Sequence, residues 1–231
     1  NDAGGNGGAI FNGGGTGQTL GLHRSTLSNN TADWGGAIFN DNGRGNSTLT
    51  GELNTISGNS ARNHGGGIAN VGTLNLAQST LVLNRADSDG INGGEGGGLA
   101  AFNIETLTGT IIAGNTRGLV TASSHNDIGG GFVNTASNNV VADGPSGGAI
   151  PNGVNGNIVG SNAEITIPLA RILNPTLASN GGPTQTHALV PLSPARDAGA
   201  TSTLTTDQRG SAFINIPDIG AFEYQPTNSP I

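Results

Sequence analysis

The 231-residue sequence predicts an all-β fold: a right-handed parallel β-helix of about five to six coils with an irregular C-terminal cap. Three observations lead to this prediction. A short motif recurs at nearly constant spacing, apolar and polar residues alternate with a period of two, and 42 glycines interrupt the chain without any amphipathic helical pattern. Such repeats indicate parallel strands in register, on coils stacked about 4.8 Å apart.

The first repeated motif begins with glycines and ends in asparagine. The strings GGAIFN, GGAIFN, GGGIAN and GGGLAAFN begin at residues 7, 35, 65 and 96, so successive units are 28, 30 and 31 residues apart. Glycine permits a corner that a Cβ atom would obstruct, and the aliphatic residue belongs to a core strand. We therefore expect one apolar stack along the axis, formed by Ile10, Ile38, Ile68 and Leu99.

A second motif recurs as STLSNNTA (25–32), NTISGNSA (54–61), STLVLNRA (79–86) and GTIIAGNTR (109–117). Between the two motifs lie alternating stretches such as QTLGL (18–22) and GTLNL (72–76). The residues that alternate with polar or small neighbours are Leu20 and Leu22, Leu74 and Leu76, and Leu81 and Leu83. Each unit thus contains three short strands, which we expect to form a triangular coil. Leu27, Ile56, Leu81 and Ile111 should form a second stack.

The recurrent asparagines are expected at the corners of the coils. Asn12, Asn40, Asn70 and Asn103 close the first strand of successive units, and Asn30, Asn59, Asn84 and Asn115 follow the third strand. Asparagine tolerates unusual backbone angles, and its amide can bond the neighbouring backbone. Stacked amides can also bond one coil to the next. The sequence therefore predicts two structural asparagine ladders rather than catalytic residues.

Composition excludes several functional classes. The net charge is −7, and all eight basic residues are arginine, which disfavours nucleic acid as a partner. No apolar run approaches the 18 or more residues that span a bilayer. The absence of cysteine excludes thiolate catalysis and disulfides. Because Asn1 opens within a repeat-like stretch, we expect that the chain derives from a longer precursor.

The chain is expected to divide into coils at 1–167 and a C-terminal cap and tail at 168–231, packed on the last coil. The repeats become irregular after about residue 118, and proline becomes frequent from Pro168. A solenoid needs a distinct terminal unit to cover its exposed edge.

Three stretches of this C-terminal region resemble bacterial choice-of-anchor Q domain proteins: NPTLASNGGPTQTHALVPLSPARDAG (174–199), TDQRG (206–210) and DIGAFEYQ (218–225). The GGAI repeats also look faintly like those of chlamydial polymorphic outer-membrane proteins. The resemblance implies an exported right-handed parallel β-helix, secreted or attached to the cell surface, and implies no activity. Arg196 and SAFINIP (211–217) depart from the family pattern without affecting the expected fold.

An enzymatic alternative is a lyase acting on acidic polysaccharides, which needs a base and a cation near the substrate carboxylate. His23, Arg24, Arg62 and His64 lie at corners of neighbouring coils and are the candidates for one shared face. In the C-terminal region, His187, Asp197, Asp207 and Arg209 also suggest a charged cluster, for which we favour a buried structural network.

Calcium is the candidate cofactor. The glycine-rich stretch DSDGINGGEG (87–96) contains Asp87, Asp89, Asn92 and Glu95, and Ca²⁺ takes six to eight oxygen ligands on flexible loops. The stretch lacks the spacing of an EF-hand, so a polar insertion between coils is the competing interpretation.

Three functional classes follow from these observations. We favour a non-catalytic, extracellular structural or adhesive protein of the bacterial surface, with a matrix polysaccharide or protein as partner. The alternatives are a filament or matrix subunit that self-associates through open β-helix ends, and a polysaccharide-active enzyme.

Overall fold

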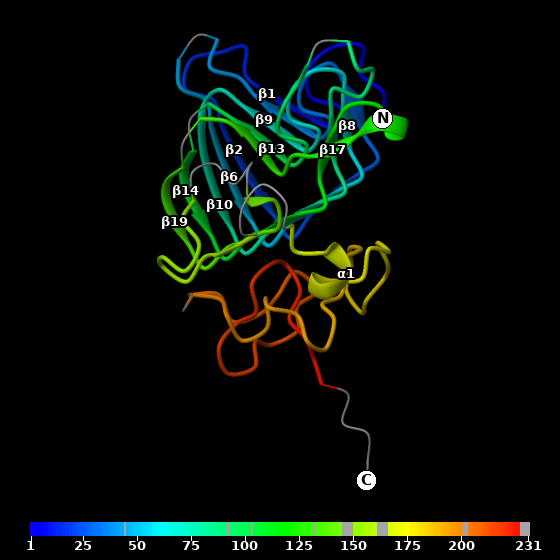
Figure 1. Ribbon diagram of the computed structural model, residues 1–231. Coiled ribbons are helices and arrows are strands. Elements are labelled where there is room, and N and C mark those ends of the chain that lie inside the picture. Colours follow the sequence, from blue (N-terminus) through cyan, green and yellow to red (C-terminus); the bar gives the residue numbers. More distant parts are fainter. Residues whose placement is uncertain are drawn as a thin grey trace.

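The computed structural model describes residues 1–43, 45–91, 93–102, 104–131, 133–144, 150–160, 166–200 and 203–226. Asn92 and Asn103 lie outside the described residues. The described chain forms a parallel β-solenoid with almost no helix, followed by an irregular C-terminal segment beside it (Figure 1). The predicted all-β solenoid is thereby confirmed.

Four sheets run along the solenoid, and each sheet is built from corresponding strands of successive coils. The first sheet contains β1 (Ile10–Asn12), β5 (Ile38–Asn40), β9 (Ile68–Asn70), β13 (Leu99–Ala101) and β18 (Ile128–Gly130). The second contains β2 (Thr19–His23), β6 (Thr48–Glu52), β10 (Thr73–Ala77), β14 (Ile104–Thr108) and β19 (Val133–Ser137).

The third sheet contains β3 (Thr26–Ser28), β7 (Thr55–Ser57), β11 (Thr80–Val82), β15 (Ile111–Ala113), β20 (Val140–Val141) and β21 (Ile158–Val159). The fourth contains β4 (Thr31–Ala32), β8 (Ser60–Ala61), β12 (Arg85–Ala86), β16 (Thr116–Arg117) and β17 (Ser124–His125). A 3₁₀ turn, η1 (Val120–Ala122), and one short helix, α1 (Leu169–Ile172), complete the described elements.

Because the first sheet stacks five strands, four full turns separate β1 from β18. The number of complete turns is therefore slightly lower than the five to six coils expected. The coil also has four strands rather than three, since a two-residue strand follows the corner after the third sheet. Two residues are too few to produce a visible alternation of apolar and polar positions, which explains why the sequence pattern missed this strand.

The fourth sheet explains the glycine pair of the first motif. Gly35 has a φ of +62°, in the left-handed region where a side chain is strained. Its counterpart Gly65 has a φ of +69°, and the next residue, Gly66, lies against the backbone of Arg85 in β12, where a Cβ atom would overlap main-chain atoms. The first glycine thus makes the corner, and the second allows the chain to cross the neighbouring strand closely.

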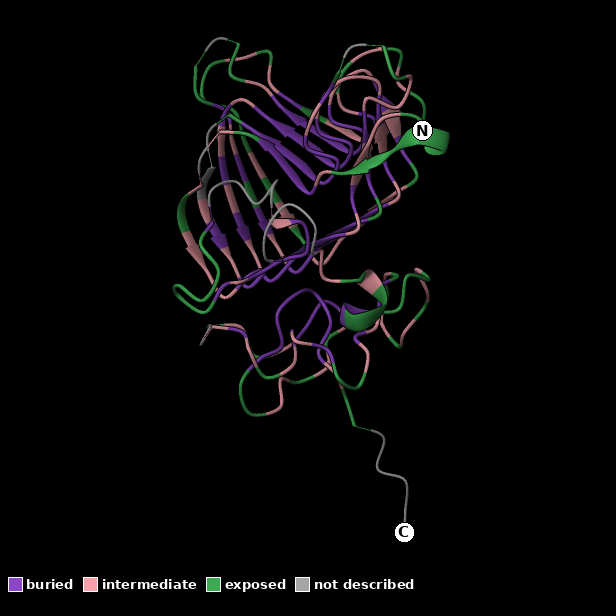
Figure 2. Cartoon of the chain, in the orientation of Figure 1, coloured by how far each residue is buried: buried purple, intermediate pink, exposed green. Residues whose placement is uncertain are grey.

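The interior contains the expected aliphatic stack of the first sheet. Ile10 pairs with Ile38, Ile38 with Ile68, and Ile68 with Leu99, and the stack continues to Ile128. The side chains of β5, β9 and β13 in this stack are fully buried, as the purple inner strands of Figure 2 show. Burial of each such side chain contributes about 1.5–3 kcal/mol relative to an exposed one.

The second expected stack is wrong at its last member. Leu27 pairs with Ile56 and Ile56 with Leu81, but the partner of Leu81 is Ile112. Ile111 pairs with Thr80 and points to the outer face, because neighbouring side chains of a strand point to opposite faces.

Leu83, which alternates with Leu81 in the sequence, does not point into the core. It occupies a turn with a φ of +60° and is 39% exposed.

The C-terminal segment covers the outer face of the third sheet. Ile111, Val82 and Val140 of that face form a second apolar cluster with Ile172 and Phe222. Hydrogen bonds also join the segment to the first coil, where the Thr26 hydroxyl donates to the Gln185 carbonyl at 2.5 Å. The segment therefore runs along the side of several coils, from Thr26 in the first to Val140 near the last (yellow to red in Figure 1). The expected boundary between coils and cap at residue 168 stays a prediction.

Candidate functional site

The asparagines of the first sheet form a row of side-chain hydrogen bonds. Asn12 donates from Nδ2 to Oδ1 of Asn40 at 2.7 Å, and Asn40 donates to Oδ1 of Asn70 at 2.6 Å. Asn40 and Asn70 are fully buried. Their amides also donate to backbone carbonyls of the following corner, namely Thr73 for Asn40 and Gly72 for Asn70. The side chains thus satisfy corner groups that would otherwise be buried without partners.

The corner after the third sheet has a longer row. Each amide donates from Nδ2 to Oδ1 of the next residue: Asn30 to Asn59, Asn59 to Asn84, and Asn84 to Asn115, at 2.9–3.0 Å. The same Oδ1 atoms accept the backbone N–H groups of Asn30, Asn59 and Asn84. All four amides therefore point the same way along the axis, and the row ends on a carboxylate, that of Asp127.

Asp127 occupies the position where a further coil would place asparagine. After β16 the chain reverses, so that β17 pairs with β16 in the antiparallel sense and returns Asp127 to the end of the row. Its Oδ1 accepts the Asn115 backbone N–H at 3.0 Å and the Asn115 Nδ2 at 2.8 Å. Its Oδ2 accepts the backbone N–H of Asp143 at 2.8 Å.

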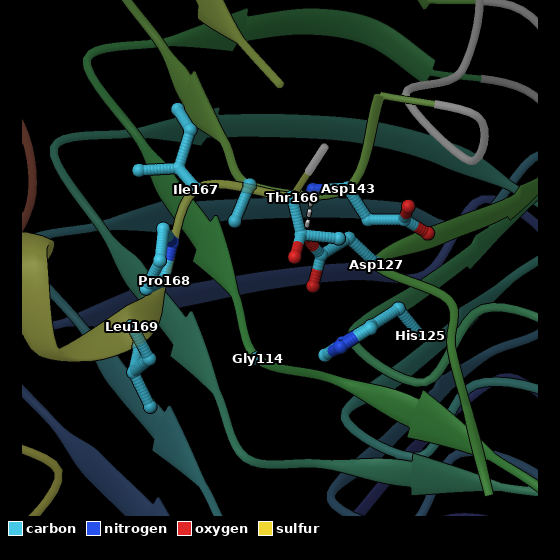
Figure 3. A pocket seen from close by; sticks show the side chains of 9 residues that line it. Gly114, His125, Asp127, Asp143, Thr166, Ile167, Pro168 and Leu169 are labelled. Atoms are coloured by element: carbon cyan, nitrogen blue, oxygen red, sulfur yellow. Dashed lines mark hydrogen bonds between the residues drawn. The ribbon is translucent and has the colours of Figure 1, made fainter. Parts of the chain in front are cut away.

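A pocket of about 270 Å³ lies beside Asp127. Figure 3 shows His125, Asp127 and Asp143 on one side of it, and Ile167, Pro168 and Leu169 on the other. Burial raises the pKa of Asp127 to about 7, against the opposing effect of the hydrogen bonds from Asn115 and Asp143. A buried carboxyl group with such a pKa can hold a proton near neutrality.

The chemistry of this pocket is limited by what Asp127 already binds. Both of its oxygens accept hydrogen bonds from the chain, and these bonds join the end of the asparagine row to the segment at Asp143. Structural hydrogen-bond networks shift pKa values as active sites do. These hydrogen bonds assign Asp127 a structural role, that of the last acceptor in the asparagine row.

The candidate lyase residues do not share one face. His23 ends β2 and Arg24 follows it, whereas Arg62 and His64 follow β8, on a different corner. His23 lies 3.2 Å from Glu52, and Arg62 pairs with Asp33 at 2.7 Å. The Arg24 guanidinium donates to the Asp207 carbonyl and to Thr206 in the C-terminal segment. His64 accepts the Glu95 N–H on Nδ1 at 3.1 Å, so all four groups are engaged in separate intramolecular contacts.

One serine and one histidine have the spacing of a nucleophile and its base. The Ser57 hydroxyl lies 2.8 Å from Nε2 of His187, whose Nδ1 lies 2.9 Å from the Asn174 carbonyl oxygen. With Nδ1 protonated and donating to Asn174, Nε2 accepts from Ser57. Both residues are buried, 4% and 2% exposed, between β7 and the C-terminal segment. A substrate has no access to this pair, which instead fastens the segment to the solenoid.

The charged residues of the C-terminal segment form a network separate from His187. The Arg209 guanidinium pairs with Asp207 at 2.7 Å and stacks on the Phe222 ring at 3.6 Å. Asp207 also accepts the backbone N–H groups of Arg209, Ser211 and Glu223. Asp197 joins this network through its backbone N–H, which donates to Asp218 at 2.7 Å. The network shapes the loops of the segment rather than a reactive centre.

The expected calcium ligands are not gathered around one point. Asp87 accepts the Gly93 N–H and Asp89 accepts the Ile91 N–H, both at 3.1 Å, while Glu95 lies 3.5 Å from Arg117. Asn92 is not among the described residues. In the described part of the chain, no three His, Cys, Asp or Glu side chains are arranged to hold a metal ion.

Sequence reasoning missed a third polar row, at the corner between the second and third sheets. The Asn54 Oδ1 accepts the Ser25 N–H at 2.9 Å, and Asn139 donates to Asn157 at 2.9 Å. Ser79 and Thr110 occupy the intervening coils. Because different residue types fill successive coils, the row has no repeated letter by which the sequence would reveal it. Asp127 was missed for the same reason.

Comparison with protein-family models, with curated proteins and with solved structures found no match. The resemblance of the C-terminal segment to choice-of-anchor Q domain proteins therefore stays a prediction. Of the helices in the described ranges, none has the length and apolar character that crossing a bilayer requires.

Proposed function

We propose that this chain is a non-catalytic structural or adhesive protein of the bacterial surface, related to choice-of-anchor Q domain proteins and located outside the cell. The observation that carries the proposal concerns Arg24. This arginine is one of the candidate bases of a lyase, and its guanidinium is bound by the C-terminal segment. Ser57 with His187, and Arg62 with Asp33, are likewise engaged in contacts that hold the chain together.

The fold supports the adhesive part of this proposal. In-register sheets and stacked amides make a regular solenoid whose lateral faces extend over successive coils. Such extended surfaces are what repeat proteins use to bind partners. The resemblance at 174–199, 206–210 and 218–225 supports export, since the family it points to is secreted or surface-attached.

The test of location uses intact cells that produce the protein. An antibody against the chain should label intact cells or be captured by protein in the culture medium, and external protease should remove the signal. Labelling only after the cells are broken would contradict the proposal. Purified protein should also bind intact cells whose surface glycans are untreated and bind less after periodate oxidation of those glycans.

A further inference from the structure

Aromatic rings line the outer face of the first sheet, one or two in each of four successive coils. Phe11 and Phe39 stack with ring centroids 5.8 Å apart, and Trp34 lies 6.2 Å from Phe39. His64 follows at 4.7 Å from Trp34, and Phe102 at 6.3 Å from His64. We call these five residues the aromatic row. It contains the only tryptophan of the chain and three of its six phenylalanines.

The folding of the coils accounts for this alignment. Phe11 and Phe39 occupy paired outward positions of β1 and β5, and the same register holds Ala69 in β9 and Ala100 in β13. Beyond these small residues, the row is continued by Trp34 and His64, which lie in the corners before β5 and β9. The two residues occupy equivalent places, because the Gly7 N–H donates to the Trp34 carbonyl at 2.8 Å and the Gly35 N–H donates to the His64 carbonyl at 3.0 Å.

The row is accessible at both ends. Phe11 is 48% exposed and Phe102 is 51% exposed, and Trp34 and His64 are half-buried. Phe39 is buried, 7% exposed, and supports the rings of Phe11 and Trp34 from below. A contiguous group of partly exposed aromatic side chains, held in place by their neighbours, is typical of a binding surface. The rings offer flat apolar contact at low entropic cost, since packing already restricts them.

Polar donors accompany the rings. Nδ1 of His64 accepts the Glu95 N–H at 3.1 Å, which places the proton of the neutral ring on Nε2. Within the described ranges, neither this Nε2 nor the Trp34 indole nitrogen has a hydrogen-bond partner. Two N–H donors therefore stand among the ring faces. A ligand that combines an apolar face with a rim of hydroxyl groups would use both features.

Charge limits the ligand further. Two ion pairs adjoin the row, and each brings one positive and one negative group. Asp33 of the Arg62–Asp33 pair precedes Trp34 in the chain, and Glu95 of the Arg117–Glu95 pair donates its backbone N–H to His64. The chain as a whole carries a charge of −7. Local neutrality and an acidic protein favour an uncharged ligand over an acidic polysaccharide or a nucleic acid.

The area of the row argues against a second copy of the chain as its occupant. An aromatic side chain buries about 150–250 Å² when fully covered. Five rings that are at most about half exposed therefore offer less than the roughly 800 Å² per partner of a standard protein interface. The row is long and narrow, which suits a single extended chain.

We propose that the aromatic row binds a neutral glycan laid along the solenoid axis, with sugar rings packed against the accessible parts of Phe11, Trp34 and Phe102. The coil repeat of about 4.8 Å is close to the length of one pyranose unit in an extended chain, so successive sugars meet successive coils. Hydroxyl groups at the edge of the sugars accept from Trp34 Nε1 and His64 Nε2. This inference names the ligand of the adhesive role proposed above and rests on it.

The test uses Trp34 as its own reporter, because it is the single tryptophan. Hydroxyethylcellulose, dextran and mannan serve as neutral probes, and polygalacturonate serves as the acidic probe. At least one neutral probe should change the Trp34 fluorescence in a saturable manner and retard the protein in affinity electrophoresis. The double variant Phe11→Ala/Phe102→Ala should weaken that binding about tenfold, since the two most exposed rings of the row are lost.

Leu192→Ala is the matched control, because Leu192 is an exposed apolar residue of the C-terminal segment, 94% exposed and outside the row. It should leave the affinity unchanged. The proposal is overturned if no neutral probe binds, if polygalacturonate binds more tightly, or if the double variant binds as the wild type does. A dimer in sedimentation that the double variant abolishes, or a proline-rich peptide bound at the row in place of the glycans, also overturns it.

The same samples distinguish the failure of this inference from that of the proposed function. Shortening of a probe, detected by new reducing ends or by a lower chain length, would refute the non-catalytic role whether or not the row binds. Absence of both binding and shortening would refute the glycan site and leave the structural role standing.

Discussion

Asn115 donates both its backbone N–H and its side-chain Nδ2 to one carboxylate oxygen of Asp127, at 3.0 and 2.8 Å. Every preceding member of the row makes the same pair of bonds to an amide oxygen. Asp127 Oδ1 accepts both bonds, and Asp127 has no side-chain N–H group with which to extend the row, so the row ends there. The row of amides and the fully buried acid at its end are thus parts of one structural device.

Asp127→Asn should show how much the ionisation of Asp127 lowers the free energy of unfolding as the pH rises. The pKa of Asp127 is raised from 3.8 to about 7 by burial, so its contribution to stability is fully present below pH 3.8 and is lost as the pH rises through about 7. The free energy of unfolding of the wild type should fall relative to that of the variant by up to about 4 kcal/mol over this range. Urea unfolding from pH 4 to 8 measures the difference.

If the difference in the free energy of unfolding between the two proteins does not change with pH, the raised pKa is contradicted. The variant should also be less stable by an amount that does not depend on pH, because the Nδ2 group of asparagine cannot accept the Asp143 N–H as the Oδ2 atom of Asp127 does.

Asn59→Ala should destabilise the protein by about 3 kcal/mol. The side chain is 1% exposed, donates to Asn84 and to the Leu27 carbonyl, and accepts from Asn30, so its removal leaves several buried groups unsatisfied. Asn75→Ala is the control, since Asn75 is half-buried and accepts from the Thr106 hydroxyl. Chemical denaturation should show a loss below about 1 kcal/mol for this variant, and equal losses would contradict the ladder's role.

Arg24→Ala should loosen the C-terminal segment without changing the solenoid. The guanidinium joins the first coil to Asp207 and Thr206, and no part of the proposed function assigns it to a reaction. Hydrogen exchange of backbone amides at 203–213 should accelerate in this variant. Arg62→Ala removes an exposed ion pair and should leave exchange in that segment unchanged. Similar exchange in both variants and the wild type would show that Arg24 does not hold the segment.

Ser57 and His187 should show coupled contributions to stability. Because their side chains bond at 2.8 Å in a buried position, the double-mutant cycle of Ser57→Ala and His187→Ala should give a coupling energy of about 1 kcal/mol. Independent effects would mean that the bond contributes nothing to docking of the segment.

Acid should weaken this attachment. Burial lowers the pKa of His187 below its usual 6.5, against the raising effect of the Asn174 carbonyl. The stability that depends on neutral His187 is therefore fully present above pH 6.5 and is lost as the pH falls through the lowered value. Titration of the His187 ring by NMR should give a pKa below 6.5, and a value above 6.5 would contradict the buried neutral tautomer.

The solenoid could be predicted because its determinants repeat in the sequence. Ile10, Ile38 and Ile68 recur with the glycine pair, and the register follows directly from their spacing. Ile111 was misplaced because two isoleucines stand side by side in GTIIAGN, and the pattern of the strand alone does not decide which one faces inward. The answer depends on the C-terminal segment, which buries Ile111 from the outside.

The features that were missed depend on contacts between distant parts of the chain. Asp127 takes the place of an asparagine because β17 reverses direction, and no local signal specifies that reversal. Phe11 and Phe102 lie in different coils, so their membership in one row emerges only when the coils are stacked. The side-on position of the C-terminal segment likewise requires residues such as Gln208 to meet Thr55 in the second coil, at 2.7 Å.

The most direct test of the non-catalytic role is the chain length of a polysaccharide after prolonged incubation with the protein, measured by size-exclusion chromatography. Neutral glucan, mannan and polygalacturonate are the substrates, with and without added Ca²⁺. The account predicts unchanged elution and no new reducing or unsaturated ends for any of them. Progressive shortening that Arg24→Ala or Arg62→Ala abolishes, in protein that remains folded, would contradict it.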